Sequence, residues 1–182
     1  MSGKSNISFR IAYCGIVVAL AVVVMFAALI PAMTYALPAI SGILIWTIKE
    51  QINRKWALLA FAACTLLSFM LVPEIEANIY FVAFFGYYPT LRDLLEKIKP
   101  KALAYLAKFA LFNGAVVAAF KVLCLIINVE QILEGLEDFG DMAVYVLWGF
   151  ANIAFLCYEI CLGALMFAYI KWLKPKLNKR IK

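Results

Sequence analysis

Two ionisable side chains lie deep inside long apolar runs, where they could bind a solute or transfer a proton. Lys121 falls within residues 102–127, and Glu159 falls within residues 142–170. A charge inside a membrane is costly, so such a residue is expected to face the interior of a helix bundle or an aqueous cavity. Both residues are therefore candidate substrate-binding groups.

Helix geometry places each of these charged residues at the same membrane depth as an asparagine. With a rise of about 1.5 Å per residue, Asn113 and Glu159 each lie roughly 18 Å from the basic residue at the inner end of their run. On the same scale Lys121 and Asn152 lie roughly 30 and 28 Å from it, near the outer boundary. One interpretation is a cavity that opens outward and uses all four residues. The other is a helix-packing hydrogen bond at each level, with Lys121 extending to the outer headgroups.

An aromatic stretch is the second candidate. Residues 80–88 contain six aromatic side chains in nine positions. Such rings could stack on a planar ligand or surround a cation, although lipid-facing and interfacial packing would use the same residues. Tyr80, at the start of the stretch, and Tyr35, in the loop before the second apolar run, are further candidate substrate-binding residues.

Catalysis has little support. The chain has no histidine, no paired carboxylate motif, no phosphate-binding loop and no GxSxG sequence. We therefore expect neither an enzyme, nor a bound cofactor, nor a metal site. The five cysteines form no CxxC pair and are interpreted as small buried apolar residues.

The composition indicates which elements position these residues. Of 182 residues, 66% are hydrophobic and 15% charged, with a mean hydropathy of +0.94. Soluble domains are nearer half apolar and a quarter charged, so this chain is predicted to be an all-α integral membrane protein forming a single domain, 1–182.

Six transmembrane helices in one bundle are predicted, of which the second and fourth are short. The first run is about 20 residues, longer than the apolar core of a signal peptide, so it is interpreted as an uncleaved span. An amphipathic cytoplasmic segment is predicted at 91–99. The predicted spans are approximately 11–30, 35–48, 56–72, 78–90, 102–127 and 142–170.

The charges give the orientation. With six spans, 16 of the 17 basic residues lie on one side, and seven of the 11 acidic residues lie on the other. Basic residues mark the cytoplasmic side, so both termini are expected there, in a multi-pass cell-membrane protein, most simply a bacterial plasma-membrane protein. The basic tail is interpreted as an orientation signal that contacts membrane lipid, and no nucleic-acid partner is expected.

Small residues form a stripe on the first predicted helix. Ala12, Gly15 and Ala19 share one side, and Gly15 and Ala19 make a small-xxx-small pair. Such a pair lets a second helix approach closely, and this helix could belong to the same chain or to a partner subunit.

This organisation resembles the S component, the substrate-binding membrane subunit, of energy-coupling factor (ECF) vitamin transporters. The shared features are the six-span layout, the basic N-terminus leading into a small-residue helix at Phe9–Ala19, and a Pro-flanked second span beginning Ala36-Leu-Pro-Ala-Ile-Ser-Gly42. The resemblance in residues is strongest from Phe9 to about Val72.

The resemblance implies a subunit that captures a micronutrient-like solute from outside, between the last three helices and the first external loop. It also implies a coupling transmembrane subunit and cytosolic ATPases as partners, with contact through the small-residue stripe. The alternative is a non-catalytic scaffold subunit of a cell-envelope complex. An intramembrane enzyme using Glu159 as a base is a third hypothesis, without a second catalytic group to support it.

Overall fold

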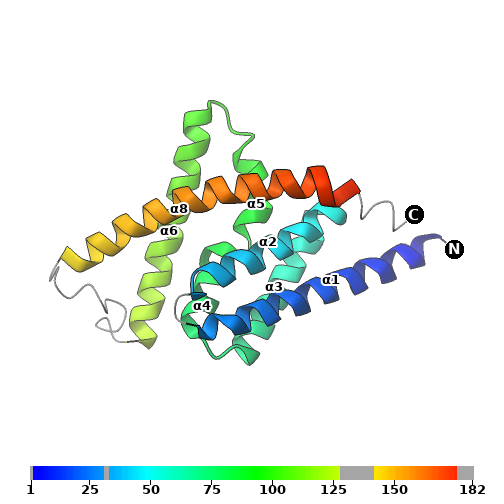
Figure 1. Ribbon diagram of the computed structural model, residues 1–182, viewed down its shortest axis with the longest axis horizontal. Coiled ribbons are helices and arrows are strands. Elements are labelled where there is room, and N and C mark those ends of the chain that lie inside the picture. Colours follow the sequence, from blue (N-terminus) through cyan, green and yellow to red (C-terminus); the bar gives the residue numbers. More distant parts are fainter. Residues whose placement is uncertain (1, 31–32, 128–141, 176–182) are drawn as a thin grey trace. The chain divides into compact units, whose positions relative to one another are not determined.

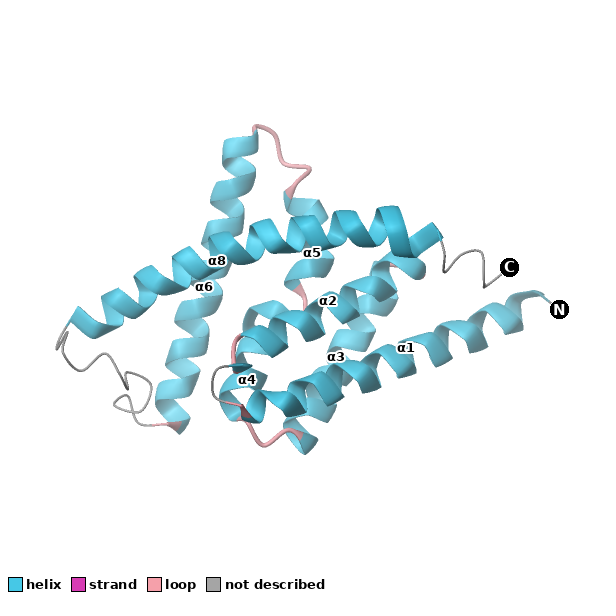
Figure 2. Cartoon of the chain, in the orientation of Figure 1, coloured by secondary structure: helices cyan, strands magenta, loops and turns pink. Residues whose placement is uncertain are grey.

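The computed structural model describes residues 2–30, 33–127 and 142–175, and every regular element in them is helical (Figure 2). The helices from α1 to α6 are joined by connections of a few residues (Figure 1). Their bounds are α1 Ser2–Phe26, η1 Ala27–Leu29, α2 Ala36–Gln51, α3 Arg54–Leu71, α4 Ile75–Tyr80, η3 Phe81–Phe85, α5 Tyr88–Leu95, α6 Lys101–Ile126, α8 Ala143–Ala168 and η5 Tyr169–Leu173.

Four helical segments are long and apolar enough to cross a membrane, which indicates a multi-pass membrane protein. They are Ile7–Leu29, Arg54–Leu71, Lys101–Ile126 and Ala143–Leu173, and they match the first, third, fifth and sixth predicted spans within a few residues. The second predicted span is a helix of 16 residues, α2, and the fourth is divided among α4, η3 and α5. The total of six spans remains a prediction.

The chain forms two compact units, Met1–Leu123 and Cys124–Lys182, and each is described here by itself. The first unit is built on α1, α2 and α3, which pack on one another. Val18, Ala21 and Met25 of α1 are buried there with Ile45 of α2 and Cys64 of α3. Small side chains on the inner face of α1 allow close packing, and the Ser41 hydroxyl donates to the Ala21 carbonyl at 3.0 Å.

Local signals explain where two of these helices begin. Asn53 precedes α3, and its side chain accepts a hydrogen bond from the backbone N–H of Trp56 at 3.0 Å, which caps the helix. Pro89 lies in the first turn of α5, where its missing N–H costs nothing.

Ion pairs join the second and fourth predicted loops at one end of this unit. The Arg54 guanidinium donates to both carboxylate oxygens of Asp93, at 2.9 and 2.7 Å, and Lys49 lies 3.1 Å from the same carboxylate. Burial raises the pKa of Asp93, but the hydrogen bonds and charges of Lys49 and Arg54 outweigh it and hold that pKa below its usual range. Glu96 accepts from Arg92 at 2.8 Å and from Lys108 of α6 at 3.3 Å. These ion pairs connect α5 to the turn between α2 and α3 on one side and to α6 on the other.

The second unit consists of the end of α6, α8 and the π-helical turn η5. Phe155, Glu159, Leu162 and Met166 recur every three or four residues and form the buried face of α8. The cysteines differ from the prediction that all are buried: Cys64 is buried, whereas Cys157 and Cys161 are exposed on α8. The acidic loop 128–141 and the end of the basic tail, 176–182, lie outside the described residues, as do Pro31 and Ala32 of the first external loop.

Candidate ligand groove

The aromatic stretch contains a π-helical turn. From Phe81 to Phe85 the backbone widens, and the N–H of Gly86 donates to the carbonyl of Phe81 at 2.7 Å, five residues earlier. Turns of this type are rare and occur frequently at functional sites, because they change the direction in which successive side chains project. Here the change brings the aromatic side chains of η3 to face both α3 and α6.

Two glycines allow this turn to pack closely. A Cβ atom on Gly42 of α2 would overlap the carbonyl oxygen of Phe85, so only a glycine lets α2 meet the backbone of η3. A Cβ on Gly86 would lie 2.5 Å from the ring of Phe61 and 2.9 Å from the ring of Phe81. The turn is thus held against α2 by a backbone contact and against α3 by aromatic rings.

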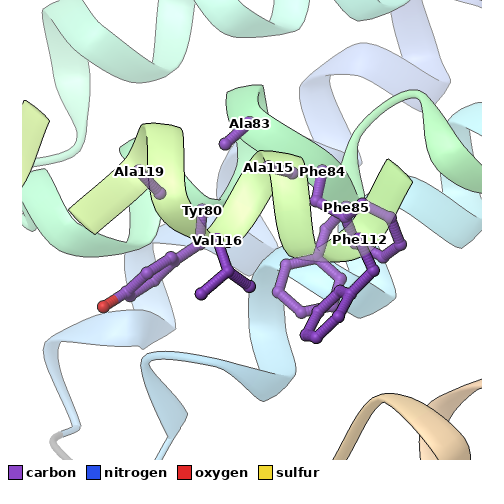
Figure 3. A pocket seen from close by; sticks show the side chains of 8 residues that line it. All are labelled: Tyr80, Ala83, Phe84, Phe85, Phe112, Ala115, Val116 and Ala119. Atoms are coloured by element: carbon purple, nitrogen blue, oxygen red, sulfur yellow. The ribbon is translucent and has the colours of Figure 1, made fainter. Parts of the chain in front are cut away.

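A small apolar groove, with a volume of about 40 Å³, runs between this segment and α6 (Figure 3). Phe84, Phe85 and Phe112 gather at one end, and Tyr80 lies at the other, with its hydroxyl at the tip (Figure 3). The lining residues are Tyr80, Ala83, Phe84, Phe85, Phe112, Ala115, Val116 and Ala119. Apart from the Tyr80 hydroxyl, these side chains carry no hydrogen-bonding group.

The rings of this segment are packed within the unit. Phe84 stacks on Tyr88 with ring centroids 4.3 Å apart and meets Phe112 of α6 edge-to-face at 5.2 Å. Phe81, Phe84 and Tyr88 are buried. The lipid-facing alternative for the aromatic stretch therefore does not describe these three rings, of which Phe84 lines the groove.

The Tyr80 end of the groove adjoins a second aromatic contact. The rings of Tyr35, from the loop before α2, and Tyr80 of α4 lie 5.0 Å apart, so these two candidate residues are brought together. Glu76 precedes Tyr80 by one helical turn and lies on the same side of α4. Burial and then the charge of Glu74 raise the pKa of Glu76, and within the described residues Glu76 forms no ion pair.

The four polar candidates within long helices are placed as follows. Asn113 donates to the Phe109 carbonyl of α6 and Asn152 to the Trp148 carbonyl of α8, each at 2.9 Å and one turn earlier. Lys121 is exposed on α6, and Glu159 is on the buried face of α8. Asn113 and Lys121 belong to the first unit, and Asn152 and Glu159 belong to the second. It thus remains a prediction that Asn113 lies level with Glu159, and Lys121 with Asn152.

Sequence reasoning overlooked the α6 wall of the groove. Phe112, Ala115 and Ala119 were not among the predicted site residues, yet they supply the surface opposite the π turn. A signal was present, because Ala115 and Ala119 are small residues four apart, as in the pair recognised in the first helix.

The small-residue stripe of α1 faces away from α2 and α3. Ala12, Gly15 and Ala19 are exposed, whereas the opposite side of α1 carries the buried core residues. A Cβ placed on Gly15 would meet nothing within 4 Å. Packing against α2 or α3 is therefore not the role of this stripe.

Among the described residues, no group of three or more cysteine or acidic side chains could hold a metal ion. Comparison with known proteins adds no assignment, because no family model, no curated protein and no solved structure matches this chain.

Proposed function

We propose that this protein is the membrane-embedded substrate-binding subunit of an ECF-type uptake transporter, which captures a small micronutrient-like solute in a cavity open to the outside. The observation that carries the proposal is the groove between the π-helical turn and α6. Short and interrupted segments in membrane proteins typically line a binding site rather than lipid, because their irregular backbone needs protein or water around it.

The charge distribution supports entry from the side opposite the basic residues. The ion pairs of Asp93 and Glu96 lie beyond the Phe84 end of the segment, whereas the Tyr80 end carries Glu74 and Glu76 without a described basic partner. By the positive-inside rule, the Tyr80 end faces outward.

The exposed stripe on α1 supports a partner subunit. Ala12, Gly15 and Ala19 present a shallow surface on which another transmembrane helix packs closely. In the proposed assembly this helix belongs to the coupling transmembrane subunit, which in turn binds the cytosolic ATPases.

Two measurements test the proposal. Affinity-tagged protein, extracted from its native membrane in mild detergent, should capture a coupling subunit and ATPases, identified by mass spectrometry. Replacing Gly15 and Ala19 by Leu should abolish this capture, while replacing Ala63, an exposed residue of α3, by Leu should leave it intact. Capture of cell-wall enzymes in place of ATPases would favour the scaffold alternative.

Ligand binding provides the second test. A substrate-binding subunit should release a bound small molecule on denaturation, or gain thermal stability from one member of a vitamin and precursor screen. Replacing Ala115 by Leu fills the groove and should remove that effect. A protein that carries no ligand, responds to none and captures no ATPase is not a transporter subunit.

A further inference from the structure

We infer that the start of α6 binds an anionic phospholipid. The headgroup phosphate contacts the lysine turn, residues 97–101, through Lys97, Lys99 and Lys101, and an acyl chain lies along Leu103 and Leu106. This site lies outside the groove and does not depend on the proposed function.

The lysine turn carries positive charge that the protein does not neutralise. The acidic residues at this end of the first unit are Glu50, Asp93 and Glu96, and each already forms an ion pair with a lysine or an arginine. The three lysines of the turn are exposed, and within the described part of the chain they form no ion pair. Three cations in five residues are therefore left for an anion from outside the chain.

The lysine turn lies beyond the end of α5. Glu96, at that end, pairs with Lys108 of α6 at 3.3 Å, and Lys101 precedes Lys108 by seven residues, or about 10 Å along the helix. The chain therefore runs past about two turns of α6 before it enters that helix, as the connection between α5 and α6 shows (Figure 1). The first two turns of α6 thus project past α5.

These two turns are apolar and exposed. The exposed fraction is 48% for Leu103, 55% for Tyr105 and 65% for Leu106. Such side chains are unfavourable in water and favourable among acyl chains. Tyrosine is also common at the boundary between membrane and water, where its ring is apolar and its hydroxyl reaches the headgroups. Apolar residues that directly follow three free lysines match the two parts of an anionic phospholipid.

The length of α6 places its first residue among the headgroups. Its 26 residues span about 39 Å, whereas the hydrocarbon core of a bilayer is about 30 Å thick. The remaining length, about six residues, must therefore lie in the headgroup regions. A soluble phosphate or an acidic protein in water would neutralise the lysines but would leave the leucines without acyl chains, so a lipid fits the site better.

The test compares two lipids that share their acyl chains and differ in headgroup charge. Phosphatidylglycerol, which is anionic, and phosphatidylcholine, which has no net charge, are titrated into the detergent-purified full chain, and bound lipid is measured by native mass spectrometry. One lysine near a membrane surface changes the affinity for an anionic lipid roughly fivefold. We therefore expect phosphatidylglycerol to bind at least about tenfold more tightly. Glycerol 3-phosphate, which has the phosphate without the acyl chains, should not displace it.

Matched charge variants locate the headgroup. Lys99→Gln combined with Lys101→Gln should reduce the preference for phosphatidylglycerol by at least about fivefold. The control, Lys171→Gln combined with Lys174→Gln, removes the same charge at the end of another long helix, where Lys171 already lies 5.5 Å from the centroid of the Phe167 ring. This control should change the preference less than about threefold.

A third variant locates the acyl chain. Leu103→Ser combined with Leu106→Ser should weaken both lipids to a similar extent and keep the preference between them, because it changes the apolar contacts alone. All the substituted leucines and lysines of the site are exposed, and thermal unfolding of each variant without added lipid shows that it is folded.

Three results would overturn the inference: equal affinity for the two lipids, equal losses in the two double-lysine variants, or displacement of the lipid by glycerol 3-phosphate. Equal affinity would instead favour the lysine turn as a docking surface for an acidic protein. The comparison of lipids on the wild-type chain decides the matter if a variant does not fold.

Discussion

Gly42 offers the sharpest test of how this fold builds its groove, because the structure gives it a close backbone neighbour. A Cβ atom there would overlap the Phe85 carbonyl oxygen and lie 2.8 Å from the Phe85 carbonyl carbon. Neither atom can rotate away, so Gly42→Ala must push α2 and the π turn apart. Overpacking of this kind costs about 1–3 kcal/mol.

Two other glycines provide matched controls. Gly15 also lies in a helix, but a Cβ there meets nothing within 4 Å. Because alanine favours a helix over glycine by about 1 kcal/mol, Gly15→Ala should stabilise the protein. The stability cost of Gly86→Ala should lie between those of the other two substitutions. A Cβ there would meet the rings of Phe61 and Phe81, which are side chains and can shift.

Thermal unfolding in detergent, followed by tryptophan fluorescence, gives the Tm of each of the three glycine variants. With about 2–4 °C per kcal/mol for a chain of this size, Gly42→Ala should lower the Tm by several degrees and Gly15→Ala should raise it slightly. Gly86→Ala should fall between them. Equal Tm values for Gly42→Ala and Gly15→Ala would refute the close approach of α2 to η3, and with it the described shape of the groove.

The remaining predictions concern polar contacts. Asp93→Asn should cost about 1 kcal/mol at pH 7, since the paired groups are partly exposed. Because the pKa of Asp93 is lowered in the folded protein, its contribution is present above about pH 4 and is lost as the pH falls through the lower folded value, so the Tm difference between wild type and variant should shrink in acid. Ser41→Ala should cost about 0.5–1.5 kcal/mol by removing the buried bond to the Ala21 carbonyl, and an unchanged Tm would mean that this bond does not form. Lys121→Met should leave ligand binding and Tm nearly unchanged because its side chain is exposed, whereas Glu159→Gln should weaken binding without unfolding the protein; normal binding by Glu159→Gln would make this buried charge structural.

The helices themselves were largely predictable from the sequence. Apolar runs bounded by Lys49, Pro73 and Lys101 end close to where the helices end, since charge and proline interrupt an apolar helix for local reasons. The joining of the second and fourth predicted loops by Arg54 and Asp93 agrees with their assignment to one side of the membrane. These features depend on residues near one another in the chain or on the net charge of a loop.

The groove was only half predictable. The aromatic stretch was recognised from its composition, but the π turn depends on a contact between Gly42 and Phe85, which are 43 residues apart. A glycine in a short apolar helix has several possible roles, and the sequence does not state which backbone it approaches. The α6 wall was missed for a similar reason, because alanines at positions 115 and 119 resemble ordinary packing residues until the opposite surface is known.

These contacts also indicate which part of the groove sets its width. The π-turn wall is fixed at three points, by Gly42 against Phe85, by Gly86 against Phe61, and by Asp93 against its basic partners. The opposite wall, α6, is joined to that wall through side chains, as in the Phe84–Phe112 contact and the Lys108–Glu96 ion pair. Side-chain contacts adjust at lower cost than a backbone contact, because rotamers can change while the packed backbone does not. Discrimination between ligands of different size is therefore expected to depend on α6, and above all on the two alanines that face the turn.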